Sequence, residues 1–191
     1  TYNVTGSQTI VGSSDNEFTY ELNDGTNEAN YDITTKFGTL TITNRDAKYE
    51  ITVVAKSDTV TYDGTKKSVS GFETLEFVVN DQKYKVEGLS AEATGTDAGE
   101  YDAEVTGTAV VKDAAGNVVT DQFSVKTQNG TLTIEKLKVT LTSATDSKEY
   151  DGTPLTNGTV TVSGDGFAEG EGATYNVTGS QTIAGSSKNT F

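Results

Sequence analysis

Residues 1–18 read TYNVTGSQTIVGSSDNEF, and residues 174–191 read TYNVTGSQTIAGSSKNTF. The two stretches differ only at Val11/Ala184, Asp15/Lys188 and Glu17/Thr190. Near-identity over so long a stretch indicates a tandem array, in which residue 174 repeats residue 1 with a period of 173 residues. We therefore expect the chain to start and to stop inside the same kind of module.

A second, weaker repeat lies inside this period. Tyr-Asp-Gly-Thr occurs at 62–65 and at 150–153, an offset of 88, and Gly-Thr-Leu-Thr-Ile occurs at 38–42 and at 130–134, an offset of 92. The period therefore holds two diverged modules, A and B. We expect a C-terminal half of module A at 1–44, a complete module B at 49–135 and the N-terminal half of the next module A at 137–191. The short joints at 44–48 and 135–137 leave little room for a flexible linker.

Hydrophobic and polar residues alternate with a period of two over most of the chain, which is typical of β-strands with one buried face. Threonine is the preferred outward residue, and Asn-Gly and Asp-Gly pairs predict tight turns between the strands. We expect an all-β chain of short hairpins, with one helical turn near Leu89–Ala93 as the only exception. The predicted core of module B consists of Val53, Tyr62, Tyr101, Val105, Phe123 and Leu132.

Composition restricts the chemistry that is available to the chain. Its 191 residues include no His, Cys, Met or Trp, and 28 acidic against 14 basic residues give a net charge of −14. Without His or Cys, a usual zinc site, a Ser/His/Asp triad, a thiol nucleophile and a disulfide are all excluded. We expect no catalytic residue, no cofactor and no resident metal. The acidic charge also disfavours nucleic acids and anionic membranes as partners, and no apolar stretch is long enough to be inserted into a membrane.

Three signatures carry a resemblance to a known family. Module B combines Tyr62-Asp63-Gly64-Thr65 with Asp97-Ala98-Gly99-Glu100-Tyr101 and the closing strand Gly130–Ile134, and together they resemble the YDG/MBG-type tandem repeats of bacterial cell-surface, adhesin-like proteins. Module A departs from the pattern, with only a loose counterpart of the middle signature at 28–32. The resemblance implies small immunoglobulin-like (Ig-like, β-sandwich) or β-grasp-like modules in an elongated array, secreted to the bacterial cell surface or cell wall and without catalysis.

Several carboxylates qualify as site residues. Asp63 and Asp151 could bind a cation or act as acids, but Asp-Gly is also a common pair in tight turns, and we favour the turn. The pairs Glu169/Glu171 and Glu100/Asp102 have the residue types of a glycosidase. Carboxylates two residues apart on a strand share one solvent-facing side, and we favour solvated charge.

Two further chemistries stay open. Calcium prefers several oxygen ligands, which acidic loops near the module joints could supply. These loops contain Asp24, Asp46, Asp58, Asp97, Asp113 and Asp165. An intramolecular Lys–Asn isopeptide bond, as in other surface modules, would join Lys138 to Asn44 in a completed module A, with Lys56 as the candidate lysine of module B.

Two classes of function remain. The first is a structural stalk or spacer that projects a distal adhesive domain, or forms an extracellular fibre. The alternative is an adhesin whose modules themselves bind glycan or host protein. Sugar-binding surfaces usually present exposed aromatic faces, and the absence of Trp favours the spacer. We also expect neighbouring repeats as partners, with 137–191 of one copy completing 1–44 of the next head-to-tail, because each half-module lacks strands that the other provides.

Overall fold

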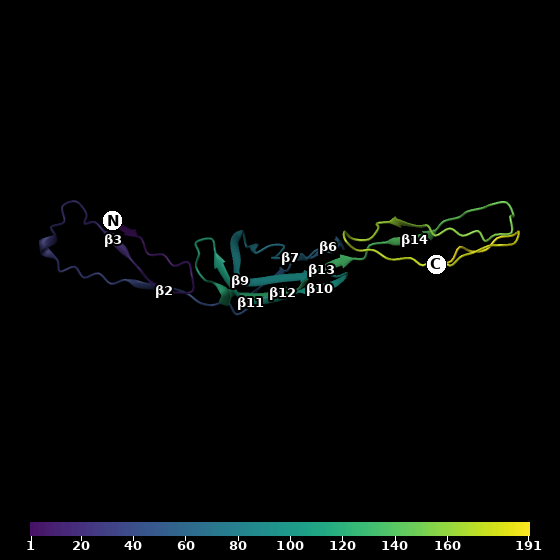
Figure 1. Ribbon diagram of the computed structural model, residues 1–191. Coiled ribbons are helices and arrows are strands. Elements are labelled where there is room, and N and C mark those ends of the chain that lie inside the picture. Colours follow the sequence, from purple (N-terminus) through teal and green to yellow (C-terminus); the bar gives the residue numbers. More distant parts are fainter. The chain divides into compact units, whose positions relative to one another are not determined.

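The computed structural model describes all 191 residues. β-Strands account for 47% of them, and the only helical elements are two short 3₁₀ turns, η1 (Glu28–Asn30) and η2 (Thr120–Gln122). The all-β class is thereby confirmed (Figure 1). No helix has the length and apolar character needed to cross a membrane.

The fifteen strands follow one another along the chain, with long connections at 21–37 and 144–159. They are β1 (Tyr2–Val4), β2 (Gly12–Asn16), β3 (Phe18–Tyr20), β4 (Gly38–Ile42), β5 (Tyr49–Val54), β6 (Asp58–Thr61), β7 (Lys67–Ser70), β8 (Glu76–Val79), β9 (Gln82–Gly95), β10 (Gly99–Ala103), β11 (Val105–Asp113), β12 (Phe123–Gln128), β13 (Gly130–Glu135), β14 (Val139–Ser143) and β15 (Val160–Gly164).

The chain divides into two compact units, each formed by several segments. Unit 1 comprises 1–54, 72–90 and 106–128, and unit 2 comprises 55–71, 91–105 and 129–191. The expected module boundaries, at 1–44, 49–135 and 137–191, stay a prediction.

In unit 1 the sheets are small. β1 pairs antiparallel with β3, β2 pairs antiparallel with β4, and β5 pairs in parallel with β12. The first part of β9 pairs antiparallel with β8. The core of this unit is the apolar cluster of Ile51, Val53, Val86, Val111 and Phe123, with Tyr49 and Tyr84 packed against it.

In unit 2 the central strand is β13, which lies between β10 and β6 in a three-stranded sheet. β13 is antiparallel to β10 and parallel to β6. β7 pairs with the last part of β9, and β14 pairs antiparallel with β15. A second core cluster is formed by Ala93, Ala103, Leu132 and Ile134.

Three of the six predicted core residues are buried, and the other three are half-buried. Val53, Phe123 and Leu132 belong to the two core clusters, and Tyr62 and Tyr101 are half-buried against the second one. Val105 is different, because it is half-buried and belongs to neither cluster. The prediction is therefore confirmed for the three fully buried residues and was too strong for Val105.

The helical turn expected near Leu89–Ala93 is wrong, since these residues continue the long strand β9. The reason is Gly88, which has a φ of 81° and whose absent Cβ would lie 2.3 Å from the carbonyl oxygen of Thr108. This irregularity shifts the inward-facing positions from Tyr84 and Val86 to Leu89 and Ala91. Such a break in the period of two imitates the end of a strand.

The expectation of hairpins alone was also incomplete. The parallel pairs β5–β12 and β6–β13 join strands that are distant in the sequence, with Phe123 opposite Tyr49 and Leu132 opposite Asp58. Alternation of polar and apolar residues predicts that a segment is a strand, but it carries no information about a distant partner.

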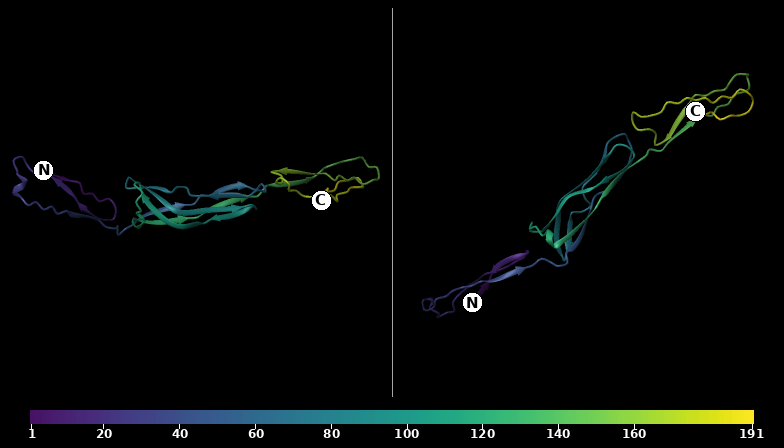
Figure 2. Two further views of the ribbon diagram at one scale, coloured as in Figure 1. Left: turned by 60° about the vertical axis from the view of Figure 1, so that its left-hand side comes forward. Right: turned by 90° about the horizontal axis from the view of Figure 1, so that it is seen from below.

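The two copies of the 18-residue repeat share several local contacts, although β1, β2 and the start of β3 lie in the first copy and no strand lies in the second. The two chain ends can be followed in purple and yellow in Figure 2. In the first copy the amides of Thr5 and Gly6 both donate to Glu17 O, and in the second those of Thr178 and Gly179 donate to Thr190 O. Tyr2 and Phe18 make an edge-to-face contact at 6.2 Å between ring centroids, and Tyr175 and Phe191 repeat it at 6.2 Å. The repeat therefore keeps the same turn and ring contacts in both copies, while only the first copy forms strands.

Strand pairing also gives the counterpart of the middle signature in module A. β2 pairs with β4 in the same register in which β10 pairs with β13, so that Gly12 corresponds to Gly99. The residues 28–32 that we matched to this signature instead form η1 and its flanks. That match was wrong because the turn has a similar composition without the following strand.

Candidate functional site

The first joint, at 44–48, is held by side chains of the same unit. The side chain of Gln122 donates through Nε2 to Asn44 Oδ1 at 2.6 Å and accepts through Oε1 from the backbone amide of Arg45 at 3.1 Å. The Arg45 guanidinium lies 4.0 Å from the centroid of the Tyr49 ring, a cation–π geometry. The short linker is therefore bonded to Gln122 and packed on Tyr49, both of the expected module B.

The second joint, at 135–137, is accompanied by a longer-range contact. The hydroxyl of Tyr62, in the first Tyr-Asp-Gly motif, donates a hydrogen bond to Glu171 Oε1. Both residues border a recess of about 310 Å³ that Leu137, Phe167 and Ala168 also line. Tyr62 belongs to the expected module B and Glu171 to the expected module A that follows it, so the contact joins the two sequence modules within unit 2.

The packing at this contact is close. Ala168 is buried, with 8% of its surface exposed. Gly64 faces it, since a Cβ on Gly64 would lie 3.8 Å from the Ala168 Cβ and 3.9 Å from Glu171 Oε1. The hydrogen bond to Glu171, followed by desolvation and by the charge of Glu171, raises the pKa of the Tyr62 hydroxyl. The phenol therefore stays protonated and donates across the physiological pH range.

The aspartates of the two Tyr-Asp-Gly motifs organise turns. Asp63 Oδ1 accepts from the amide of Thr65 at 2.9 Å and from its hydroxyl at 2.6 Å, and Asp63 Oδ2 accepts from Lys67 Nζ at 2.5 Å. Lys67 and Thr65 together lower the pKa of the Asp63 carboxyl to about 2. Gly64 has a φ of 79°, which glycine adopts without strain.

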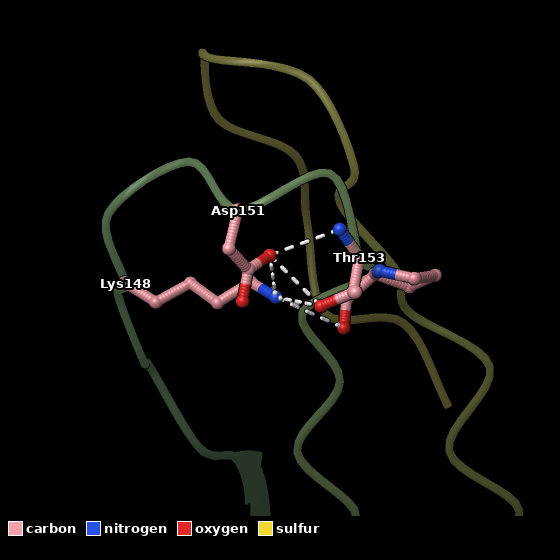
Figure 3. Close-up of polar contacts among 4 residues, drawn as sticks. Lys148, Asp151 and Thr153 are labelled. Carbon is pink, nitrogen blue, oxygen red and sulfur yellow. Dashed lines mark hydrogen bonds and ion pairs between the residues drawn. The ribbon is translucent and has the colours of Figure 1, made fainter.

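The second motif repeats this turn, but its lysine, Lys148, precedes the aspartate in the sequence, whereas Lys67 follows Asp63 (Figure 3). Asp151 Oδ1 accepts from the Thr153 amide at 2.9 Å, from the Thr153 hydroxyl at 2.8 Å and from Lys148 Nζ at 2.8 Å. These donors hold the pKa of the Asp151 carboxyl well below its usual range. Each aspartate thus has the donors of a closed turn, which supports the structural interpretation over catalysis.

The two motif tyrosines differ in their surroundings. Tyr62 is half-buried and bonded to Glu171, whereas 71% of the Tyr150 surface is exposed. The contact of Glu171 with Tyr62 was not predicted from the sequence, although the sequence carries a signal for it. Tyr175 follows β15 in the sequence in the way that Tyr84 follows β8. The offset between Tyr84 and Tyr175 is 91 residues, whereas the offset between the motif tyrosines Tyr62 and Tyr150 is 88 residues. Module A therefore carries three extra residues in the loop that reaches Tyr62.

The other carboxylate pairs do not gather into a site. Glu100 and Asp102 lie on β10 with exposed side chains, as the interpretation of solvated charge expects. Glu169 and Glu171 were expected on a strand, but they lie in a loop closed by a hydrogen bond from the Glu171 amide to Ala168 O at 3.0 Å. The strand assignment was wrong because Gly170, with a φ of 81°, turns the chain there.

The acidic loops show local bonds. Asp113 caps its own loop, accepting from the amides of Ala115 and Asn117 at 3.0 and 2.8 Å, and Asp165 accepts from the Lys138 amide at 2.8 Å. No group of three or more acidic side chains lies close enough together to hold a metal ion. Calcium binding remains an untested expectation.

The residues considered for an isopeptide bond are engaged differently. The Asn44 side chain is bonded to Gln122, and Lys56 and Lys138 are exposed. A Lys–Asn crosslink therefore also remains an untested expectation.

Comparison of the chain with family models, with curated proteins and with solved structures gave no match.

Proposed function

We propose that the chain is a stretch of stalk or spacer repeats from an exported bacterial surface protein or extracellular fibre, which projects a distal adhesive domain. The single observation that carries the proposal is the hydrogen bond between Tyr62 and Glu171, which connects consecutive sequence modules through the repeated motif itself. In this proposal Glu171, whose residue type is that of a glycosidase carboxylate, holds one module against the next by accepting this hydrogen bond.

The first joint supports the same role. Gln122 and Tyr49 engage Asn44 and Arg45, so the short linker is bonded on its module B side. A spacer needs joints that resist bending, because the distance it spans depends on the stiffness of its connections. The closed Tyr-Asp-Gly turns and the negative charge fit a soluble scaffold without catalysis.

The exposed tyrosines are the observation that favours the alternative function, an adhesin that binds glycan or host protein. The surfaces of Tyr2, Tyr31 and Tyr150 are exposed to 77%, 61% and 71%. Aromatic faces of this kind bind sugars in many proteins. In the stalk proposal these rings are contact surfaces for neighbouring modules, and the two functions are separable by experiment.

A glycan array and a panel of immobilised host matrix proteins, probed with the 191-residue chain, test the proposal. The stalk function predicts signals no higher than those of a variant with Tyr2, Tyr31 and Tyr150 all changed to Ser. Saturable binding that the triple variant loses would overturn the proposal in favour of the adhesin.

A further inference from the structure

A groove of about 890 Å³ in unit 2 lies between two segments of the N-terminal half of module A. The segments 143–150 and 179–191 line it, together with Leu155 and Asn157. Residues 144–150 form no strand and are exposed over 145–150. The groove therefore offers backbone groups that lack a strand partner.

Module B shows what fills the equivalent space. There β13 lies between β10 and β6. With an offset of 88, β6 (Asp58–Thr61) corresponds to 146–149 of the groove lining. β10 corresponds through β2 to the second repeat copy, at 185–189. Both flanking segments of β13 are therefore present around the groove, and the central strand is missing from it.

The segment 143–150 already has the local geometry of the complete module. The Asp146 carboxylate accepts from the Ser147 amide at 2.8 Å, just as the Asp58 carboxylate accepts from the Thr59 amide at 2.8 Å. The amide of Ala144 donates to Thr159 O at 3.0 Å, as the amide of Lys56 donates to Gly71 O at 3.0 Å. Asn189 Nδ2 anchors the segment 179–191 by donating to Ala144 O at 3.1 Å and to Asn157 O at 2.9 Å.

The counterpart of β13 exists elsewhere in the chain, as β4 in unit 1. β4 pairs on one edge with β2 and has no strand on its other edge. The segment that contains it exposes residues whose module B counterparts are core. Tyr31 is 61% exposed where Phe123 is 4% exposed, and Ile42 is 37% exposed where Ile134 is 2% exposed.

We propose that the groove binds residues 31–43 of a second copy of this chain as added strands. The inference names the partner of the proposed stalk repeats and rests on their alternation as modules A and B. Transfer of the β13–β6 register aligns Leu40 with Asp146 and Ile42 with Lys148. Transfer of the β5–β12 register aligns the preceding residues, from Tyr31, with the segment that starts at Leu137 and continues into β14.

Docking requires an exchange of hairpins. In the free chain β4 pairs with β2, and in the groove the nearly identical 185–189 takes the place of β2. The exchanged pairings are chemically equivalent, and the docked strand gains a parallel partner and buries its exposed apolar side chains. The contact is heterologous, so it produces open chains of copies.

Gly38 provides a specific test. Its counterpart Gly130 has no room for a Cβ, which would lie 2.1 Å from Lys56 O, whereas a Cβ on Gly38 would meet nothing within 4 Å. The position that would crowd Gly38 in the docked state is Ala144 O. Gly38→Val is therefore harmless to β4 in the free chain but incompatible with docking, and Gly172→Val, at a glycine that is equally open, is the matched control.

Sedimentation velocity over a range of concentrations measures the association. We expect the wild-type chain and Gly172→Val to form a series of oligomers. We expect Gly38→Val to associate at least about tenfold more weakly. A wild-type chain that stays monomeric at all concentrations, or a Gly38→Val chain that associates like the wild type, would overturn the proposal.

Engineered disulfides test the register, since the chain has no cysteine. Ser13 Oγ and Thr41 Oγ1 lie 2.9 Å apart across the β2–β4 pair, and Ser186 is the repeat counterpart of Ser13. After oxidation, Thr41→Cys with Ser186→Cys should give covalent oligomers, whereas Thr41→Cys with Ser13→Cys should give a monomer that no longer associates until it is reduced. Oxidation of the first pair to monomers alone would contradict the proposal. Neither result depends on the glycan array, so failure here is distinguishable from failure of the stalk function.

Discussion

The ring of Tyr101 lies directly over the α-carbon of Gly95. A Cβ on Gly95 would be 2.3 Å from Tyr101 Cε2, and the Tyr101 hydroxyl donates to Asp97 O at 2.9 Å. The ring therefore closes the β9–β10 turn and covers the second core cluster, to which Tyr101 is packed.

Gly95→Ala should destabilise this part of the protein, because the new methyl group would displace the Tyr101 ring from its place. Overpacking of this kind costs about 1–3 kcal/mol. Urea unfolding followed by tyrosine fluorescence measures the loss, with Gly172→Ala as the control at an open position. Equal midpoints for the two variants would show that the ring accommodates a methyl group.

Leu132→Ala and Leu40→Ala compare the core of module B with the equivalent position in β4 of module A. Leu132 is fully buried with 0% exposure, and truncation of such a residue costs about 2–5 kcal/mol. Leu40 has the equivalent position in β4 and is only half-buried, so Leu40→Ala should cost much less in the monomeric chain. Thermal unfolding at low protein concentration compares the two. A similar loss in both variants would mean that β4 already has a complete core in the single chain.

The carboxyl of Asp63 should titrate with a pKa of about 2, below its usual 3.8, because of Lys67 and Thr65. Since the folded-state pKa is the lower one, the stabilisation by this turn is present above pH 3.8 and is lost as the pH falls through about 2. Lys67→Gln should move the titration midpoint upward. NMR observation of the side-chain carboxyl carbon measures it, and Lys66→Gln serves as the control. A midpoint that is unchanged by Lys67→Gln would refute the assigned cause.

Tyr62 should titrate above the usual phenol pKa of 10.0, since it donates to Glu171. The raised folded-state pKa means that the contact contributes fully below pH 10.0 and is lost as the pH rises through the shifted value. Ultraviolet absorbance measures phenolate formation. In Glu171→Gln one tyrosine should titrate at a lower pH than in the wild type, and Glu169→Gln should leave the curve unchanged. If Glu171→Gln gives the wild-type curve, the two side chains do not interact in solution.

Strands and repeats were predictable from the sequence because both rest on local patterns. Alternation placed Val53, Phe123 and Leu132 on inward faces, and the structure buries all three. The path of β9 was not predictable, because the positive φ of Gly88 changes the inward-facing positions without a change in composition.

Contacts between residues distant in the sequence were also not predictable. The parallel pairing of β13 with β6, and the contact of Tyr62 with Glu171, depend on a three-dimensional arrangement that no local pattern encodes. The turns at Asp63 and Asp151 were predictable because the Asp-Gly pair is a local pattern, whereas the partner of Tyr62 lies far away in the sequence.

In the proposed stalk, a module A is completed across the boundary of the 173-residue period. The most direct test extends the chain after Phe191 with a second copy of residues 19–44, which restores the order of the repeat. Hydrogen exchange of the amides at 146–149 is the measurement. We expect these amides to become as protected as those of β6 in module B, and we expect a Gly38→Val change in the added copy to abolish the gain. Amides at 146–149 that exchange equally fast with and without the added residues would contradict this completion of module A.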